Sequence, residues 1–449
     1  MRPKAKDQRH TTLKKLATEL SKQAKTDHNT QCLRDAFDIH KKNICLNIHE
    51  AWPRALQNKP GPISVFDMFS GCGGMSAGFK LLNSIAPIID LKGAVDIDTK
   101  ANETYEENHQ LKVVDADVAK LSRSSKKLES IFNHHEFSND KIRILIGCAP
   151  CQGFSSHRNS DGEKDLRNTL FMDFAKIAVK TQPEVIVIEN VPEILTERYW
   201  PHVQKARKIL EESGYYVHVG AHNMAEFGVP QERFRALILA MKKPFHAPKG
   251  FLAPQEFATV RSSISDLPPV EAGEKCSSDP FHYSAKHKES TLATIRAVPH
   301  DGGNRPDNVG PASLRNIKST TGKAAYEDVY GRLPWDKPSI TITAFARNPA
   351  SGRFTHPEQD RALTIREASL LQGFPKQYQF SGSLDSSFRQ IGNAVPPIFS
   401  AAIASHIVSE LLSPPIAEEN FDRGILGAVG ASFSRAIPSI KARSRATKN

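Results

Sequence analysis

Short apolar runs alternate with amphipathic stretches across residues 61–241. The apolar runs are ISVFDMF, KGAVDID, IRILIG, EVIVIEN, YYVHVGAH and FRALILAM, and stretches with helical spacing, such as NTLFMDFAKIAVKT, separate them. Alternation of continuous apolar strands with helices is typical of a parallel sheet that is covered by helices on both faces. The pattern therefore predicts an α/β fold built on a doubly wound, parallel sheet.

The alternation stops near Lys242. Residues 243–360 are rich in Pro, Gly and Ser and show little periodicity, which predicts a second, smaller and loop-rich domain. Regular spacing returns over 361–415, where LTIREASLLQGFP precedes the apolar helix PPIFSAAIASHIVSELL, and a basic tail follows over 416–449. Residues 1–60 show partial helical periodicity and end in the boundary sequence NKPGP, so we expect a basic, helical extension there.

Composition narrows the class of protein. Hydrophobic residues make up 39% and charged residues 24% of the chain, as is usual in soluble globular proteins. No run approaches the ~18 apolar residues of a membrane span, and the basic start MRPKAKDQRHTTLKK lacks the apolar stretch of a secretory signal. Six cysteines over this length do not make a disulfide framework. We therefore expect a cytoplasmic protein without a membrane segment.

The net charge of +11 is unevenly distributed. Residues 1–60 hold 13 Lys and Arg against 6 Asp and Glu, whereas residues 61–241 hold 21 against 24. Basic flanks around a mildly acidic centre fit a catalytic core whose surroundings bind a polyanion such as nucleic acid. Solvated basic ends explain the same distribution equally well, so charge alone does not decide between the two.

A strand, a glycine-rich turn and a helix start follow one another in VFDMFSGCGGMSAGF, from Val65 to Phe79. Glycines let the backbone approach a ligand, and a helix N-terminus offers free N–H groups. The spacing is not the G-x-G-x-x-G dinucleotide fingerprint, so a nucleoside without a pyrophosphate, such as S-adenosylmethionine, fits better. Asp96 ends the next apolar run, where a doubly wound site holds a ribose hydroxyl; alternatively, Asp96 and Asp98 cap the following helix.

Two cysteines with C-x-x-C spacing, Cys148 and Cys151, end another apolar run in IRILIGCAPCQGFSS. The spacing is compatible with a redox dithiol, half of a zinc site or one working thiolate. A zinc site needs a second pair, which the remaining cysteines do not form. We favour Cys151 as a single nucleophile, because free amides in the turn after Pro150 would favour a thiolate. A dithiol oxidoreductase is the alternative.

Glu189 ends one further apolar run, and a row of polar residues with two arginines stands at the start of another. A carboxyl at the end of the apolar strand VIVIENV is a candidate acid with a raised pKa, although a helix N-cap before PEIL is the alternative. Gln231, Arg233 and Arg235 occupy alternate positions in QERFR, so on a strand they would project from one face. Two guanidinium groups there would hold an anion or a carbonyl oxygen, or else form a surface row of salt bridges.

Taken in order, these motifs resemble the motif set of the cytosine-5 DNA methyltransferases. The set is FDMFSGCGG, DID, GCAPCQGFS, ENV, QERFR, RALTIREASLLQGFP and QIGNAVPP, and it covers roughly residues 61–241 and 361–412. Seven motifs in the family's order are far more specific than any one of them. The resemblance implies a Rossmann-like S-adenosylmethionine-dependent methyltransferase domain formed by residues 61–242 and 361–415, with residues 243–360 as the target-recognition domain.

The resemblance also implies a reaction. A methyl group would pass from S-adenosylmethionine to carbon 5 of a cytosine that is flipped out of a specific double-stranded DNA sequence. Cys151 would add to carbon 6 as the nucleophile, and Cys148 would be an incidental neighbour. Glu189 would act at nitrogen 3, and Arg233 and Arg235 would supply positive charge near oxygen 2 and brace the site.

A cofactor site assembled from several motifs, without a metal, is implied as well. Asp96 would hold the ribose and Ile97 the adenine, whose edge Asp117 and Val118 would contact. The target-recognition domain would read the major groove, where base pairs are distinguishable. The implied cofactor-binding residues are Phe66, Gly71, Cys72, Gly73, Gly74, Asp96, Ile97, Asp117, Val118, Pro150, Asn393, Ala394 and Val395.

The expected partner is double-stranded DNA, bound by a monomer. We expect a bacterial, cytoplasmic enzyme at the nucleoid that protects DNA from a cognate restriction endonuclease acting separately. A tRNA cytosine-5 methyltransferase of the same family and a non-catalytic DNA-binding repressor are the alternatives. The closing motif GNAVPP and the long recognition segment favour DNA, and the intact Cys151 and Glu189 argue against a repressor.

Overall fold

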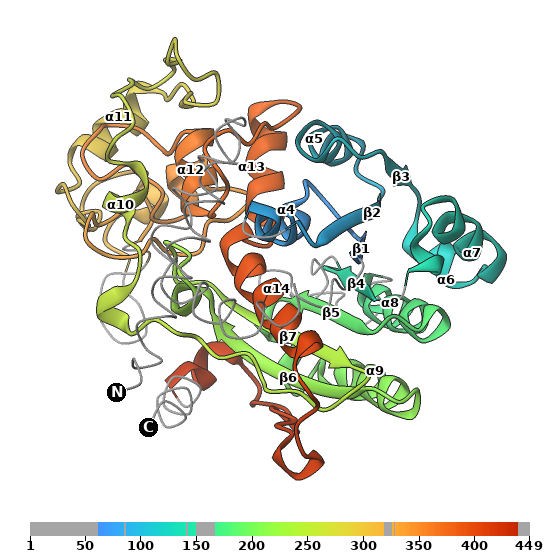
Figure 1. Ribbon diagram of the computed structural model, residues 1–449. Helices are drawn as coiled ribbons and strands as arrows, with labels where there is room; N and C mark the ends of the chain where they lie inside the picture. The colour runs from blue at the N-terminus through green and yellow to red at the C-terminus, as the bar shows by residue number, and fades with distance from the viewer. Residues whose placement is uncertain are drawn as a thin grey trace, which may run out of the picture.

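The computed structural model describes residues 62–438, except 85–86, 141, 150–166, 318–325 and 327. The predicted extension over 1–60 lies outside the described residues, as do Pro150 and Cys151. Within the described part, the chain forms a sheet with helical layers and a smaller lobe at one end (Figure 1).

A seven-stranded sheet forms the core, with the strand order β3-β2-β1-β4-β5-β7-β6. The strands are β1 Ile63–Met68, β2 Ile89–Asp96, β3 Val113–Asp115, β4 Arg143–Gly147, β5 Val185–Asn190, β6 Tyr216–Asn223 and β7 Phe234–Met241. Every neighbouring pair among β1 to β5 is parallel. The predicted α/β fold class is therefore confirmed.

The sheet is not wholly parallel as predicted, because β7 runs antiparallel to both β5 and β6. The cause lies in the connection from β6 to β7. It holds only the short 3-10 turn η5, Met224–Phe227, and a few further residues, whereas a parallel crossover needs roughly a dozen residues or more. The two strands therefore form a hairpin that places β7 beside β5 and leaves β6 at the edge of the sheet.

Helices cover both faces of the sheet, as the continuous apolar strands predicted (Figure 1). Along β1, Val65 packs into the core on one face and Phe66 into the core on the other, because neighbouring residues of a strand point to opposite faces. Helices α4 and α14 pack on the Val65 face, and α6 to α9 on the Phe66 face. The helices are α4 Gly74–Leu81, α5 Thr99–His109, α6 Val118–Ser122, α7 Ser125–His134, α8 Arg167–Thr181, α9 Trp200–Glu212 and α14 Pro397–Leu412.

Helix α14 is apolar because it is a core helix. The stretch Leu384–Leu412 has the length and hydropathy of a helix that could cross a membrane, but 72% of its most apolar window is buried inside the protein. Ser400 of α14 donates a hydrogen bond of 2.6 Å to the carbonyl oxygen of Met75 in α4. A Cβ on Gly78 would lie only 2.3 Å from Ser400 Cβ. This close approach explains why α4 needs a glycine at that position.

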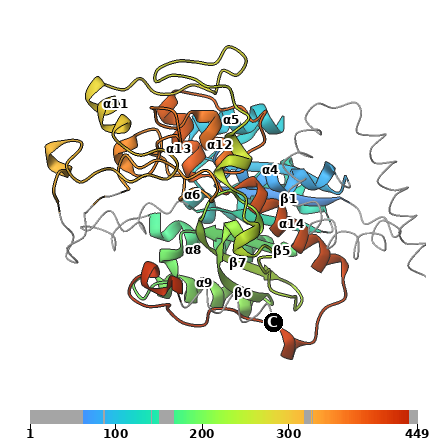
Figure 2. The ribbon, with the colours of Figure 1, turned by 90° about the vertical axis from the view of Figure 1, so that its left-hand side faces the viewer.

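The smaller lobe comprises the described residues of 260–360 together with α12, Ile365–Leu371, and α13, Leu384–Asn393. The start of the irregular segment 243–360 packs on the sheet instead, where Phe245 lies in its core. The core of the smaller lobe joins Val260, Trp335 and other residues of the irregular segment to Phe388 of α13. Its other two helices are α10 Val260–Ile264 and α11 Glu289–Arg296. Figure 2 shows α11, α12 and α13 together, away from the β6 edge of the sheet. Helices α12 and α13 therefore pack with the smaller lobe, whereas α14 packs on the sheet.

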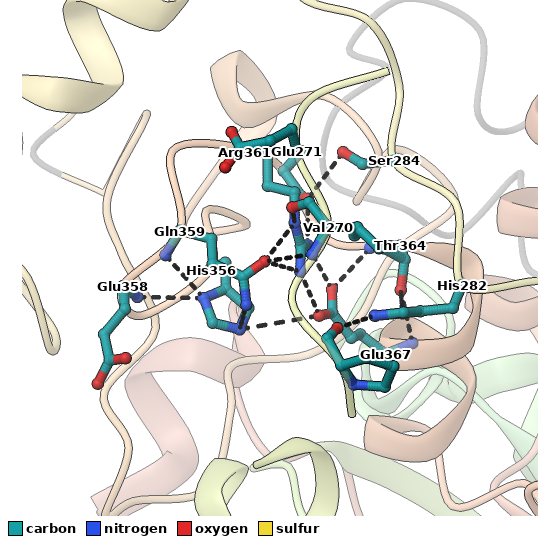
Figure 3. Close-up of polar contacts among 12 residues, drawn as sticks. Val270, Glu271, His282, Ser284, His356, Glu358, Gln359, Arg361, Thr364 and Glu367 are labelled. Carbon is teal, nitrogen blue, oxygen red and sulfur yellow. Dashed lines mark hydrogen bonds and ion pairs between the residues drawn. The ribbon is translucent and has the colours of Figure 1, made fainter. Parts of the chain in front are cut away.

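A buried ion pair fixes α12 within the smaller lobe (Figure 3). The side chains of Arg361 and Glu367 are 0% and 1% exposed, and they make two hydrogen bonds of 2.8 and 2.7 Å. Arg361 also donates to the carbonyl oxygen of Val270 at 2.8 Å, and Glu367 accepts from Thr364 N at 2.8 Å. Burial opposes the charge of the carboxylate, but Arg361, together with His356 and the Thr364 N–H, outweighs burial and lowers the pKa of Glu367 to about 2.

Replacing Glu367 with Gln is expected to destabilise the protein. The change leaves the Arg361 guanidinium buried without its counter-charge, which costs about 3–5 kcal/mol in comparable buried pairs. The urea midpoint of unfolding, followed by circular dichroism, should fall. Glu419→Gln at an exposed position is the control and should keep the wild-type midpoint. A Glu367→Gln midpoint equal to that of the control would contradict the stabilising role of the pair.

Candidate active site

Four parallel strands end in register at their carboxyl ends. These ends form the edge of the sheet that runs across the strands, which is distinct from the edge formed by the outermost strand β6. Met68 of β1 pairs with Val95 of β2 and Gly147 of β4, and Gly147 pairs with Ile188 of β5. The carboxyl ends of strands in a doubly wound sheet are where ligands bind. The residues that directly follow these four are Phe69, Asp96, Cys148 and Glu189. The structure therefore brings four of the sequence motifs to one edge.

Asp96 joins the end of β2 to the glycine-rich turn. One carboxylate oxygen accepts a hydrogen bond of 2.8 Å from Gly71 N, and the other accepts from Ile97 N at 2.7 Å and Asp98 N at 2.8 Å. The alternative role of a helix cap is correct for Asp98, which accepts from the first-turn amides of α5, and it is wrong for Asp96. Burial raises the pKa of Asp96, although these amides oppose the shift.

The glycine-rich turn adopts a backbone that side chains rarely allow. Gly71 and Gly73 have φ angles of +51° and +87°, and a Cβ on Gly73 would lie 2.4 Å from His109 Nε2. Two buried side chains hold the turn in place. His109 Nε2 lies 3.2 Å from the carbonyl oxygen of Gly73, and the Tyr378 hydroxyl donates to the carbonyl oxygen of Cys72 at 2.6 Å. Sequence reasoning missed both braces, because His109 and Tyr378 are remote from the turn along the chain.

Ile97 and Asp117, the predicted adenine contacts, differ in exposure and in hydrogen bonding. The Ile97 side chain is 67% exposed although it is large and apolar, so it offers an apolar surface beside Asp96. Asp117 is half-buried and caps α6 by accepting from Ala119 N at 2.9 Å. The side chain of Val118 is buried in the core, so Val118 could contact a ligand only through its backbone.

Phe66 is a correction to the predicted cofactor site. It is fully buried, with its ring centroid 4.6 Å from that of Phe132 and 5.4 Å from that of Phe137. Phe66 lies in β1 on the face that packs against α7, so it cannot line a ligand site. Phe69 stands at the strand end instead and has a positive φ of 60°. Its position directly before the glycine-rich turn was the signal that the sequence offered.

Cys72 and the segment 393–395 meet at the base of the turn. The thiol of Cys72 points to α13, 3.6 Å from the carbonyl oxygen of Gln390, and burial raises its pKa to about 12. Cys72 can therefore serve a ligand only through its backbone. A Cβ on Gly74 would lie 2.3 Å from Val395 O and 3.2 Å from Ala394 Cβ. The structure thus places the returning segment against the glycine-rich turn, as the resemblance implied.

Glu189 and Arg235 form a largely buried ion pair at the end of β5. Arg235 Nε lies 3.1 Å from Glu189 Oε1, and the two side chains are 13% and 7% exposed. β7 runs antiparallel beside β5, with Asn190 opposite Ala236, which brings Arg235 next to the carboxyl. Burial raises the pKa of Glu189, and the charges of Arg235 and Arg233 oppose the shift without cancelling it. The N-cap alternative for Glu189 is not observed. The 3-10 turn after β5 begins at Pro192, and its N-cap residue is Val191.

The predicted arginine row is wrong as a single strand face, because β7 begins only at Phe234. Arg233 donates from its guanidinium to the carbonyl oxygens of Ile342 at 3.1 Å and Gly392 at 3.0 Å. Gln231 accepts from Ile342 N at 3.0 Å. Gln231 and Arg233 therefore fasten the smaller lobe to the sheet, and Arg233 acts on Glu189 through its charge from a distance.

The cysteine motif is described only as far as Ala149. Cys148 is half-buried, and its N–H donates to Met68 O at 3.4 Å. Asn190, the residue after Glu189, donates from its side-chain amide to the carbonyl oxygen of Ala149 at 3.4 Å. The entry to the cysteine motif is therefore tied to the end of β5. The predicted roles of Pro150 and Cys151 lie outside the described residues and stay predictions.

Comparisons with known proteins agree on one family. The model of the C-5 cytosine-specific DNA methylase family matches residues 63–409. The Type II methylase M.HgiDII of Herpetosiphon aurantiacus is 31% identical over 356 residues, covering 77% of this chain and 94% of the relative. The Type II methyltransferase M1.HphI of Haemophilus parahaemolyticus is 32% identical over 351 residues, covering 77% and 87%.

A solved structure shares the fold. It is a DNA modification methyltransferase encoded within a prophage of E. coli, with a TM-score of 0.60, 23% sequence identity, and coverage of 78% of this chain and 100% of that protein. At this identity the likeness shows the fold alone. The two proteins therefore share one fold over most of this chain.

Replacing Gly73 with Ala is expected to destabilise the glycine-rich turn. The positive φ disfavours a side chain, and the added Cβ would collide with His109 and Tyr105. We expect a loss of about 1–3 kcal/mol, measured as a lower melting temperature. Gly427→Ala is the matched control, because its Cβ would meet nothing within 4 Å. A Gly73→Ala protein that melts together with the control would contradict the steric role of this glycine.

Proposed function

The chain belongs to the C-5 cytosine-specific DNA methylase family, and we propose that it transfers a methyl group from S-adenosylmethionine to carbon 5 of a cytosine flipped out of double-stranded DNA. One observation carries the proposal. The ion pair of Glu189 and Arg235 stands at the same sheet edge as the glycine-rich turn that Asp96 holds. A carboxyl group that could protonate a nucleobase and a turn that could bind the nucleoside of the cofactor thus lie at the same edge of the sheet.

The residues around the glycine-rich turn fit S-adenosylmethionine, which supplies the methyl group on an electrophilic sulfonium. A carboxylate offers about four lone-pair positions. Three backbone amides donate to Asp96, which leaves about one position for a ribose hydroxyl. The exposed Ile97 would lie against the adenine ring, and Asp117 would accept from its amino group. Asn393 to Val395 would close the methionine side, and Phe69 takes the place proposed for Phe66.

Cys151 is the proposed nucleophile. Its thiolate would form a bond to carbon 6 of the flipped cytosine, which makes carbon 5 electron-rich. Carbon 5 would then take up the methyl group, and the bonding electrons would stay with the donor sulfur. Loss of the carbon 5 proton to water and breakage of the carbon–sulfur bond, with its electrons returning to Cys151, would restore the ring.

Glu189 would supply the proton or hydrogen bond that nitrogen 3 needs when the thiolate adds. Burial favours the protonated carboxyl, because an uncompensated charge is unfavourable away from water. Arg235 would fix the direction of the carboxyl through its contact of 3.1 Å and would place positive charge toward oxygen 2. Arg233 supports the same site through its bonds to the smaller lobe.

The smaller lobe is the proposed target-recognition domain. It would read the major groove, and the target cytosine would leave the base stack to reach the sheet edge. Membership of a family with Type II methyltransferases supports a restriction–modification role, in which methylation would protect bacterial DNA from a separate cognate endonuclease. We further propose that the enzyme acts as a monomer in the cytoplasm.

Bisulfite sequencing of DNA from bacterial cells that express the chain tests activity, product and target sequence together. Wild type should yield protected cytosines within one short sequence. Cys151→Ala should abolish the protection, with methyl transfer in vitro reduced more than about a thousandfold because the covalent route is lost. Cys148→Ser is the matched control and should stay within a few-fold of wild type. A fully active Cys151→Ala protein, or equal loss in both variants, would contradict the nucleophile assignment.

The pH dependence of kcat should report the protonation of Glu189. The protonated carboxyl is the active form, so kcat should be retained below the pKa of Glu189 and fall as pH rises through it. Because burial raises that pKa, the fall should begin above the ordinary glutamate value of about 4.3. Glu189→Gln should lower kcat at least about tenfold and remove this limb. A variant that keeps the wild-type pH profile would contradict the role of Glu189 as acid.

A further inference from the structure

The chain continues past the family match, which ends at residue 409, into a segment that crosses the edge of the sheet. We name residues 413–438 the C-terminal strap. The strap leaves the end of α14 and passes β6, the edge strand, before it reaches the side of the sheet that carries α9 (Figure 2). Its first half packs away from the Glu189–Arg235 pair, and its second half contacts the elements next to that pair.

The first half of the strap packs at the end of the β6–β7 hairpin that lies away from the site. Phe421 places its ring centroid 5.3 Å from that of Tyr216 and 5.1 Å from that of Phe245. Tyr216 pairs with Met241 at this end of the hairpin. Phe421 therefore anchors the strap without touching the strand ends that carry Glu189 and Arg235.

The middle of the strap pairs with the edge strand. Val219 N donates to Arg423 O at 3.2 Å, and Ile425 N donates to Val219 O at 2.8 Å. Arg207 of α9 donates to the carbonyl oxygens of Ile425 at 3.0 Å and Arg423 at 3.2 Å. These contacts cover part of an edge whose backbone groups would otherwise be open to another strand.

The second half of the strap reaches the elements beside the Glu189–Arg235 pair. Val429 N donates to Leu195 O at 3.0 Å, and Glu197 N donates to Gly430 O at 3.1 Å. Leu195 ends the 3-10 turn η4, Pro192–Leu195, which directly follows β5. Phe433 is 3% exposed, and its ring centroid lies 5.9 Å from that of Phe234, the residue before Arg235.

We propose that the C-terminal strap sets the geometry of the Glu189–Arg235 pair, with Phe433 as a positioning residue for methyl transfer. The strap holds η4 behind Glu189 through backbone hydrogen bonds and holds the start of β7 beside Arg235 through Phe433. Strands β5 and β7 are paired as far as Asn190 and Ala236, and the strap packs against the chain just beyond this pairing, at η4 and at Phe234. A displacement of about 1 Å can slow a positioned reaction about a hundredfold. The inference rests on the proposed function.

The test compares Phe433→Ala with Phe421→Ala, the same substitution in the same strap at the far end of the hairpin. Purified proteins are assayed for methyl transfer to duplex DNA, and activity is normalised to the concentration of sites that bind S-adenosylhomocysteine. Phe433→Ala should lower kcat about tenfold, with KM for DNA and for S-adenosylmethionine within about twofold of wild type. Phe433→Leu, which refills the space, should restore kcat to within about twofold.

Phe421→Ala should melt at a lower temperature but keep kcat per binding site within about twofold of wild type. If Phe433→Ala does not fold, Phe433→Val with its smaller gap replaces it, with the same expected direction. Equal kcat in wild type and the Phe433 variant, or equal loss in the Phe421 and Phe433 variants, would overturn the inference. Wild type without methyl transfer would instead overturn the proposed function, so the two failures are distinguishable.

Discussion

The site depends on one constraint, which is that parallel strands β1, β2, β4 and β5 end in register at the same edge of the sheet. Hydrogen bonding between the strands fixes this register as far as Met68, Val95, Gly147 and Ile188. Residues that follow the strands are therefore neighbours although they are remote in sequence. Asp96 and Glu189 owe their positions to this register. Loops can then vary around a rigid edge without moving the groups that the edge carries.

A second constraint joins the smaller lobe to that edge. Gln231 and Arg233 are fully or almost fully buried, and they bind backbone groups of the smaller lobe at Ile342 and Gly392. The next residue but one, Arg235, binds Glu189. A short segment before and at the start of β7 thus connects the lobe proposed to recognise DNA with the carboxyl proposed to act on the base. Movement of the smaller lobe would therefore shift Arg235 and, with it, the carboxyl of Glu189.

Much of this arrangement could be predicted from the sequence, because it depends on local pattern. The alternation of apolar runs with helical stretches identified six of the strands and the layered α/β class, and the strand ends identified Asp96 and Glu189. What failed depended on partners remote in the chain. Phe66 lies in the same motif as the glycine-rich turn, but only the packing of α7 against β1 shows that its side chain is buried in the core. Strand β7 is antiparallel because the connection from β6 to β7 is short. That β7 also pairs with β5 could not be read from this connection alone.

The braces of the glycine-rich turn show the same limit. His109 and Tyr378 belong to separate elements, and nothing in their own surroundings in the sequence indicates that they meet under Gly73. The C-terminal strap was predicted only as a basic tail, since its apolar residues, such as Phe433, are too widely spaced to predict a packed segment. Long-range packing, and not local propensity, decides these positions.

The proposed reaction requires that Cys151 form a bond to the base. The most direct measurement is mass spectrometry of the protein after incubation with S-adenosylmethionine and duplex DNA that carries 5-fluorocytosine at the target position. Fluorine at carbon 5 cannot leave as the proton does, so the adduct cannot resolve. We expect a methylated fluorocytosine bound to the peptide that contains Cys151. An adduct at Cys148, or methyl transfer to normal DNA with no adduct on the fluorinated DNA, would contradict this expectation.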